Sequence, residues 1–137
     1  MGTSMNNEIF AVHFAELLAG GFDACEYDVN GQKYVEVRKI PIDGSVWNMA
    51  EANILIAVPS NYNIGGLDGF YIEDGLLLAN NQAHQRTRHQ GVCVILDRNW
   101  RIVSWHYQQN KPWSSSDTIV THVHHCRLFF KQGARKD

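Results

Sequence analysis

The chain has 137 residues, a formal net charge of −2 and a sequence pI near 6.4. This length is most simply one domain, and the slight excess of acid gives no reason to expect binding to nucleic acid. No apolar run approaches the roughly 20 residues that a membrane helix needs, and no segment has the pattern of a signal peptide. The three cysteines lack the paired spacing of a disulfide framework, which favours free thiols. We therefore expect a cytoplasmic protein that binds neither nucleic acid nor membrane.

The two ends of the chain differ in composition from the part between them. Met1-Gly2-Thr3-Ser4 ahead of Met5 is typical of a cloning scar, so residues 1–5 are expected to be a scar or a disordered start. Residues 132–137 are mostly polar and are expected to form a frayed tail. The sequence therefore predicts a single domain over residues 6–131.

The N-terminal part of the chain predicts a helix followed by a hairpin. Residues 6–19 predict an amphipathic helix, because four apolar side chains recur at helical spacing: Phe10, Phe14, Leu17 and Leu18. Asn30-Gly31 supplies the positive φ angles of a type I′ turn. Residues 25–29 and 32–40 are therefore predicted to be two antiparallel strands joined by that turn.

The middle of the chain predicts further strands. Residues 52–58 form a continuous apolar run that is typical of a central strand, and residues 69–72 predict a short one. A second hairpin is expected from residues 92–96 and 101–107, with its turn at residues 97–99.

The C-terminal part predicts a second helix. Ser116 or Asp117 makes a good N-cap, and an apolar stripe follows at helical spacing: Ile119, Val123, Cys126 and Phe130. The elements together predict an α+β fold. It has an N-terminal helix, an antiparallel meander, a long loop plus a hairpin, and a C-terminal helix, with the helices packed on one sheet.

Cys93 is the first candidate for chemistry, because it begins an apolar strand directly after the polar segment 80–90. A thiol attacks as the thiolate, which needs access and a neighbour that lowers its pKa or stabilises an oxyanion. Four side chains within ten residues upstream could supply these: His84, Gln85, Arg88 and His89. The alternative is a buried strand cysteine beside a solvated loop. Cys25 and Cys126 are expected to be structural thiols.

Two other kinds of site fit the sequence less well. A zinc site could draw on His84, His89 and Cys93, or on His122, His125 and Cys126, but neither set has the tight paired spacing that zinc sites usually show. A hydrolase arrangement of Asp117 with a histidine lacks a serine in a nucleophile-elbow pattern. We therefore expect neither a metal nor an organic cofactor.

Five short motifs follow one another between residues 40 and 117. They are Ile40-Pro41-Ile42-Asp43-Gly44, the stretch 54–62, Asp68-Gly69-Phe70-Tyr71, the stretch 100–106, and Trp113 with Asp117. In this order they resemble motifs of the bacterial E2-like proteins called prokaryotic E2 family E, which have the ubiquitin-conjugating (UBC) fold. The resemblance covers roughly residues 40–130 and implies that fold for this chain.

The chain also departs from the E2 pattern near Cys93. The His-Pro-Asn motif is missing, and Ala83-His84-Gln85 is the nearest segment to it. Residues 91–96 resemble the segment around the active cysteine of eukaryotic E2 enzymes. A strand with the pattern Trp-x-x-x-Ser-x-His lies between Cys93 and the last helix, so this interval is longer than in those enzymes.

The resemblance implies an E2-like carrier as the first hypothesis. Cys93 would accept a ubiquitin-like protein from an E1-like adenylating enzyme as a thioester and yield it to an amine. Gln85 or His84 would stabilise the oxyanion, and His106 would orient or deprotonate the incoming nucleophile. Three further residues would form the binding surface: Arg88, Trp113 and Asp117. The alternative hypothesis is a non-catalytic E2-variant module that binds a ubiquitin-like protein or an E1-like partner, with Cys93 unreactive.

Overall fold

The computed structural model describes residues 2–88 and 91–133, without the side chains of residues 2–6 and 132–133. Its long helices are α1 (Gly2–Ala19) and α2 (Ile119–Leu128), and two short helical segments cover Gln85–Thr87 and Phe129–Gly133. The strands are β1 (Asp23–Val29), β2 (Gln32–Pro41), β3 (Glu51–Val58), β4 (Phe70–Glu73), β5 (Val92–Ile95) and β6 (Arg98–Val103). None of the helices described is long and apolar enough to cross a membrane.

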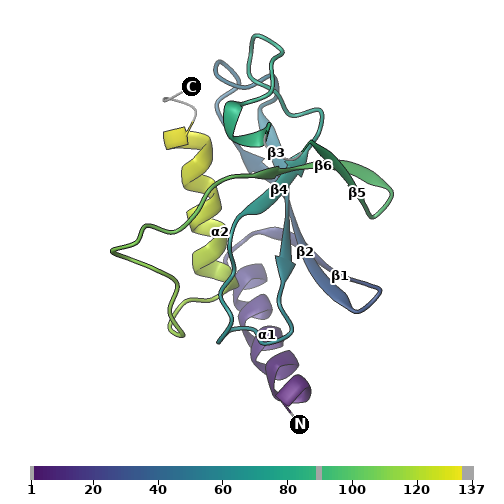
Figure 1. Ribbon diagram of the computed structural model, residues 1–137, viewed down its shortest axis with the longest axis vertical. Coiled ribbons are helices and arrows are strands. Elements are labelled where there is room, and N and C mark those ends of the chain that lie inside the picture. Colours follow the sequence, from purple (N-terminus) through teal and green to yellow (C-terminus); the bar gives the residue numbers. More distant parts are fainter. Residues whose placement is uncertain (1, 89–90, 134–137) are drawn as a thin grey trace.

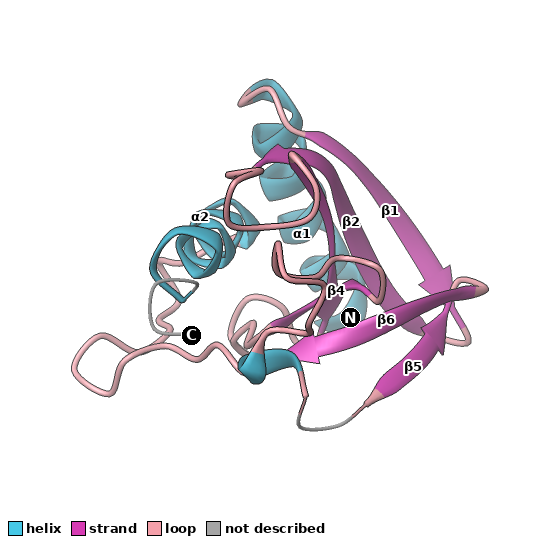
Figure 2. Ribbon diagram, turned by 90° about the horizontal axis from the view of Figure 1, so that it is seen from above, coloured by secondary structure: helices cyan, strands magenta, loops and turns pink. Residues whose placement is uncertain are grey.

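The strands form one antiparallel sheet in the order β1-β2-β3-β4-β6-β5. Both long helices lie against the same side of this sheet, as Figures 1 and 2 show. We call this side the helix face and the opposite side the outer face. The arrangement is the α+β, UBC-like fold that the sequence predicted, and it leaves β1 and β5 as the two edge strands.

The main core lies between the helix face and the two helices. Alternate residues of the central strands, such as Val37 and Ile54, point into it, because successive side chains of a strand face opposite sides of the sheet. The expected stripe of α2 is confirmed: Ile119, Val123, Cys126 and Phe130 are all buried. Phe10 and Leu17 of α1 are also buried, whereas Leu18 is exposed.

The two hairpins differ in how well the sequence predicted their turns. Asn30 and Gly31 both have positive φ, as expected of a type I′ turn. The second turn lies at Leu96 and Asp97, with φ of 57° and 59°, and not at residues 97–99. Strand β6 ends at Val103 rather than at residue 107, because its partner β4 begins at Phe70 and offers no pairing beyond that point.

The caps of the helices also differ from expectation. Thr118, and neither Ser116 nor Asp117, is the N-cap of α2, and it forms a capping box with Thr121. A carboxylate oxygen of Asp117 instead accepts the N–H of Ser114 at 2.9 Å, which closes a turn before the helix. Helix α1 begins at Gly2, four residues earlier than predicted. Residue 1 of the expected scar and residues 134–137 of the expected tail lie outside the described residues.

Candidate functional site

Cys93 lies on the outer face of the sheet, on edge strand β5. Its register partner is Trp100, which also pairs with Glu73 of β4. Glu73 follows Ile72, whose side chain points into the core, so Glu73, Trp100 and Cys93 share the outer face. The half-buried Sγ atom of Cys93 donates to the carbonyl oxygen of Trp100 at 3.6 Å, and burial raises the pKa of the thiol.

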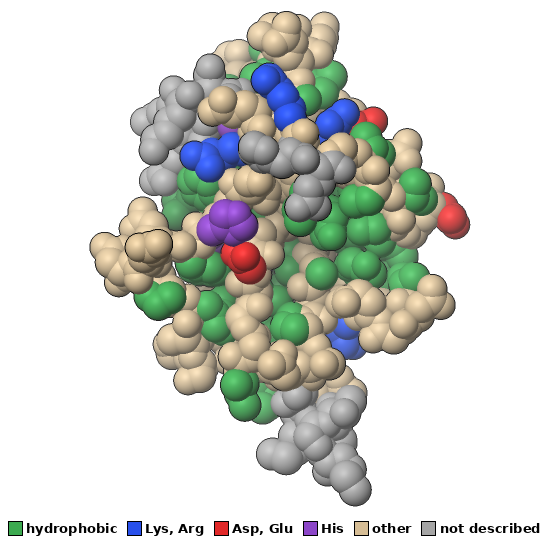
Figure 3. Space-filling model, viewed as in Figure 1, with side chains coloured by type: hydrophobic (Ala, Val, Ile, Leu, Met, Phe, Trp, Pro, Cys, Tyr) green, Lys and Arg blue, Asp and Glu red, His purple; other side chains and the backbone are tan. Residues whose placement is uncertain are grey.

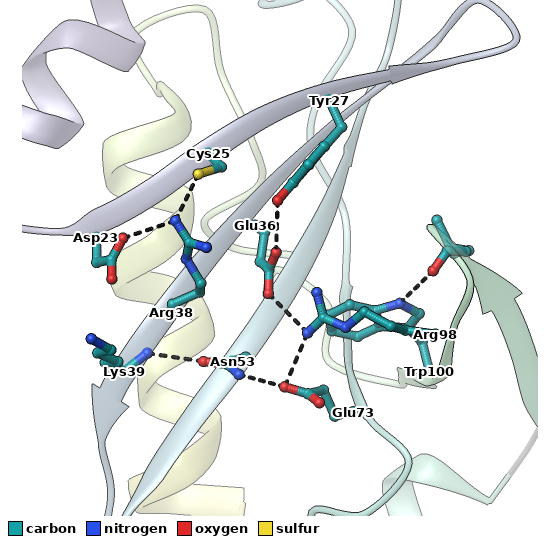
Figure 4. A network of polar contacts seen from close by, with 11 residues as sticks. Asp23, Cys25, Tyr27, Glu36, Arg38, Lys39, Asn53, Glu73, Arg98 and Trp100 are labelled. Carbon is teal, nitrogen blue, oxygen red and sulfur yellow. Dashed lines mark hydrogen bonds and ion pairs between the residues drawn. The ribbon is translucent and has the colours of Figure 1, made fainter.

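An ionic network crosses the outer face next to Cys93 (Figure 4). Glu36 of β2 is 1% exposed, and its carboxylate lies 2.9 Å from the Arg98 guanidinium of β6. Arg98 also pairs with Glu73 of β4 at 3.1 Å and lies over the Trp100 ring at 4.6 Å. The phenol of Tyr27 donates to Glu36 from β1. These contacts fasten the β5–β6 hairpin, and with it Cys93, to the strands of the meander.

The loop before β5 does not bring His84 to Cys93. His84 is 1% exposed, stacks on Trp47 at 5.7 Å and meets the edge of Phe129 at 4.9 Å. Trp47 and Phe129 belong to the core on the helix face. His84 and Cys93 therefore lie on opposite sides of the sheet.

Two other predicted residues of this loop, Gln85 and Arg88, lie on or beside its short helical segment. Gln85 is exposed and begins the short helical segment. The Nε–H of Arg88 donates to the carbonyl oxygen of Ala83 at 2.7 Å, which fastens the loop to itself. His89 lies outside the described residues.

His106 pairs with an acid that the sequence did not single out. Its Nδ1 lies 3.1 and 3.2 Å from the two carboxylate oxygens of Asp68, and both side chains are exposed, at 66% and 62%. A carboxylate can only accept, so Nδ1 of His106 is the donor in this pair. The pair stands on the segments that follow β6 and precede β4, and it does not include Cys93.

Next to this pair, Tyr107 and two histidines of α2 pack together. The Nε2 of His122 donates to the carbonyl oxygen of Gly69 at 2.8 Å, so its Nδ1 accepts the Tyr107 hydroxyl at 2.7 Å. Tyr107 stacks on His125, with ring centroids 4.0 Å apart. Burial lowers the pKa of His122 to about 4 and also lowers the pKa of His125, so both rings are neutral at pH 7.

Trp113 and Asp117 shape the connection between β6 and α2. The indole N–H of Trp113 donates to the carbonyl oxygen of Asn63 at 3.1 Å. The Asn63 amide donates in turn to the carbonyl oxygens of Ser115 and Asp117 at 2.9 and 2.8 Å. Asn63 thus fastens this connection to the loop after β3.

A groove of about 1110 Å³ is lined by residues of the connection 104–118 and of helix α2. We call it the α2 groove. Figure 1 shows the connection running beside α2. His106 and Asp117 both line it, so the structure brings these two predicted residues together and leaves Cys93 outside. Figure 3 shows a histidine beside an acidic side chain on this side of the molecule, with basic side chains above them.

A family model for prokaryotic E2 family E matches residues 17–131 of the chain. The chain belongs to prokaryotic E2 family E. No curated protein and no solved structure gave a significant match. This E2 family connects the chain with bacterial ubiquitin-like conjugation. The match extends further towards the N-terminus than the five motifs do, and it includes the end of α1 and the first hairpin.

Two features of this E2-family chain escaped the sequence reasoning. The first is the contact between Asp68 and His106. The two residues are 38 positions apart in the sequence, and no local pattern shows that they meet. Glu36 carried one weak signal, since it lies between Val35 and Val37 and an acid needs a partner, here Arg98, when it is buried. No three His, Cys, Asp or Glu side chains within residues 2–88 and 91–133 are grouped closely enough to hold a metal ion.

Proposed function

We propose that this E2-family chain is a binding module that recognises a ubiquitin-like protein or an E1-like partner without forming a thioester on Cys93. The observation that supports the proposal is the placement of the Cys93 thiol. It is half-buried on the outer face, it donates to the Trp100 carbonyl, and it lies across the sheet from His84.

The surroundings of Cys93 stabilise the thiol and not the thiolate. Burial raises its pKa, and no cationic side chain among the described residues counteracts this effect. Cys25 is a useful contrast, because the Arg38 guanidinium donates to its Sγ atom at 2.7 Å. A carrier cysteine needs the kind of neighbour that Cys25 has and Cys93 lacks.

The oxyanion stabiliser of an acyl transfer must also lie about 3 Å from the reacting carbonyl. His84 donates no such bond, because its ring is enclosed between Trp47 and Phe129 and its Nδ1 accepts the backbone N–H of Arg86 at 3.1 Å. The groups that the carrier hypothesis needs are thus distributed over two sides of the sheet. A binding role needs no such convergence.

The carrier remains the second candidate, and the position of Cys93 on an edge strand favours it. Among the described strands β5 pairs with β6 alone, so within this part of the chain its other edge is open to a partner. An extended C-terminal tail of a ubiquitin-like protein could pair with that edge and bring its carboxyl group to the thiol. In that case Gln85 or His106 would have to reach the tail from the loops on either side.

Binding of the ubiquitin-like protein from the same bacterium tests the proposal. We would measure its Kd by isothermal titration calorimetry with the unaltered chain and with Cys93→Ser. We expect the two Kd values to agree within about twofold. In this proposal the Cys93 thiol is not part of the binding surface, so its replacement removes little binding free energy. Cys25→Ser serves as the matched control for the loss of one thiol. Loss of measurable binding in Cys93→Ser alone would contradict the proposal.

A further inference from the structure

The α2 groove has the size and the position of a peptide-binding site. Its volume of about 1110 Å³ is slightly larger than the roughly 300–1,000 Å³ that small-molecule sites occupy. One wall is the connection that follows β6, and the other is helix α2 (Figures 1 and 2). Neither wall includes Cys93, so the groove is distinct from the edge of β5.

The charge of the α2 groove is opposite to that of the whole chain. Four cationic residues line it: Arg86, Lys111, Arg127 and Lys131. Asp117 is the one acid among the lining residues described, and its carboxylate already accepts the N–H of Ser114. The chain as a whole has a net charge of −2, so the cations are concentrated here. A groove with this charge complements a segment rich in carboxylates.

Two buried polar atoms of the groove residues lack a partner within the described part of the chain. They are Nε of Arg86 and Nε2 of His125. Buried polar atoms are nearly always hydrogen-bonded in folded proteins, so each of these needs an explanation. Both atoms are closed off from solvent, so a segment bound in the groove would reach them only after the Arg86 and His125 side chains shift.

The floor of the groove is aromatic. The Arg86 guanidinium lies 5.5 Å from the Trp105 ring centroid, and Tyr107 stacks on His125. Such a floor suits the apolar side chains of a peptide between its carboxylates. A nucleic acid would also meet the cations, but the net negative charge of the remaining surface opposes a long polyanion.

From the cations and the aromatic floor of the α2 groove we infer that it binds an acidic peptide segment of a partner protein. The inference rests on the proposal that the chain is a binding module. It adds that one part of the partner, the segment bound in the α2 groove, is acidic. It does not depend on Cys93.

The test uses the full chain and a short fluorescent peptide in which glutamate alternates with leucine or tyrosine. Fluorescence polarisation at low salt would give its Kd. The same peptide with glutamine at every glutamate would show how much of the affinity depends on the negative charges of the peptide. We expect Lys111→Glu and Lys131→Glu each to weaken binding about tenfold, since each removes an attraction and adds a repulsion. Lys39→Glu makes the same charge change on the exposed side of β2 and should leave the Kd unchanged.

Three outcomes would overturn the inference. The first is no binding of the acidic peptide, and the second is an equal loss in Lys39→Glu, which would show an effect of net charge alone. The third is tighter binding of an oligothymidine that carries the same number of charges. The peptide assay does not contain the ubiquitin-like protein. A failure of the peptide to bind would therefore overturn the inference about the groove, while the proposed function is tested separately by the Kd of the whole ubiquitin-like protein.

Discussion

At the scale of single residues, the three cysteines differ because of what surrounds each thiol. Cys126 is fully buried in the stripe of α2, and burial raises its pKa well above the usual value. Cys93 is half-buried beside a carbonyl, and Cys25 is half-buried beside a guanidinium. Burial disfavours the thiolate of Cys93 and of Cys126, whereas the Cys25 thiol has a cation as its hydrogen-bond donor.

We therefore expect a fixed order of thiol labelling in the native chain. Cys25 should react with N-ethylmaleimide before Cys93, and Cys126 should react at the rate of unfolding. Mass spectrometry of peptides from a time course would assign each site, with the urea-unfolded chain as the reference in which all three react. If Cys93 reacts first in the native chain, our description of its surroundings is wrong.

The buried His122 makes stability depend on pH. Its pKa is lowered from 6.5 to about 4 in the folded chain, so the unfolded state binds the proton first as the pH falls. The contribution of the neutral ring is fully present above the unfolded pKa of 6.5 and is lost as the pH falls towards about 4. We expect the free energy of unfolding to fall by about 2 kcal/mol between pH 7 and pH 5 on account of this residue.

Urea denaturation at the two pH values checks this expectation. His122→Gln should be less stable at pH 7, because Gln cannot reproduce both bonds of the ring, but its stability should change less between the two pH values. The lowered pKa of His125 adds to the effect in both chains. An equal change in the variant and in the unaltered chain would show that His122 is not the group that titrates.

At the scale of elements, the sequence predicted what local patterns encode. The first hairpin followed from Asn30-Gly31, since both residues accept a positive φ. The second turn was misplaced, because Leu96 adopts a positive φ that is rare for its residue type, although Asp97 beside it is of a type that tolerates one. The location of His84 could not be predicted, since its neighbours Trp47 and Phe129 are far away in the sequence.

The β5–β6 hairpin depends on the ionic network of the outer face. Arg98→Ala would leave the Glu36 carboxylate buried with the Tyr27 hydroxyl as its remaining partner. We expect this variant to lose about 3 kcal/mol of unfolding free energy, because an unpaired buried charge is costly. Arg88→Ala removes an arginine from an exposed loop and should cost less than about 1 kcal/mol. Equal losses in the two variants, measured by urea denaturation, would argue against the network.

The connection between β6 and α2 depends on a close approach at Gly66. A Cβ atom added there would lie 2.7 Å from the Trp113 ring, which is closer than packing permits. We expect Gly66→Ala to destabilise the chain by about 1–3 kcal/mol and to change the Trp113 environment. Gly44→Ala is the matched control, because its nearest contact would be at 3.9 Å. Chemical denaturation followed by tryptophan fluorescence measures both effects, and similar losses in the two variants would contradict the expected clash.

At the scale of the whole molecule, the sheet separates two surfaces of the E2-family domain. The outer face carries Cys93 and the ionic network, whereas the helix face carries the core and the α2 groove with His106. The sequence predicted the UBC-like fold from the order of its motifs. It could not predict which side of the sheet each candidate residue occupies, because one residue of register decides that for a whole strand.

The most direct test of the proposed function is whether Cys93 forms a thioester. The chain would be incubated with ATP and with the E1-like enzyme and the ubiquitin-like protein of the same bacterium, and intact mass would be measured with and without dithiothreitol. We expect a non-covalent complex and no adduct that dithiothreitol removes. A dithiothreitol-sensitive adduct that is retained in Cys25→Ala and lost in Cys93→Ala would contradict the binding-module proposal and establish the carrier.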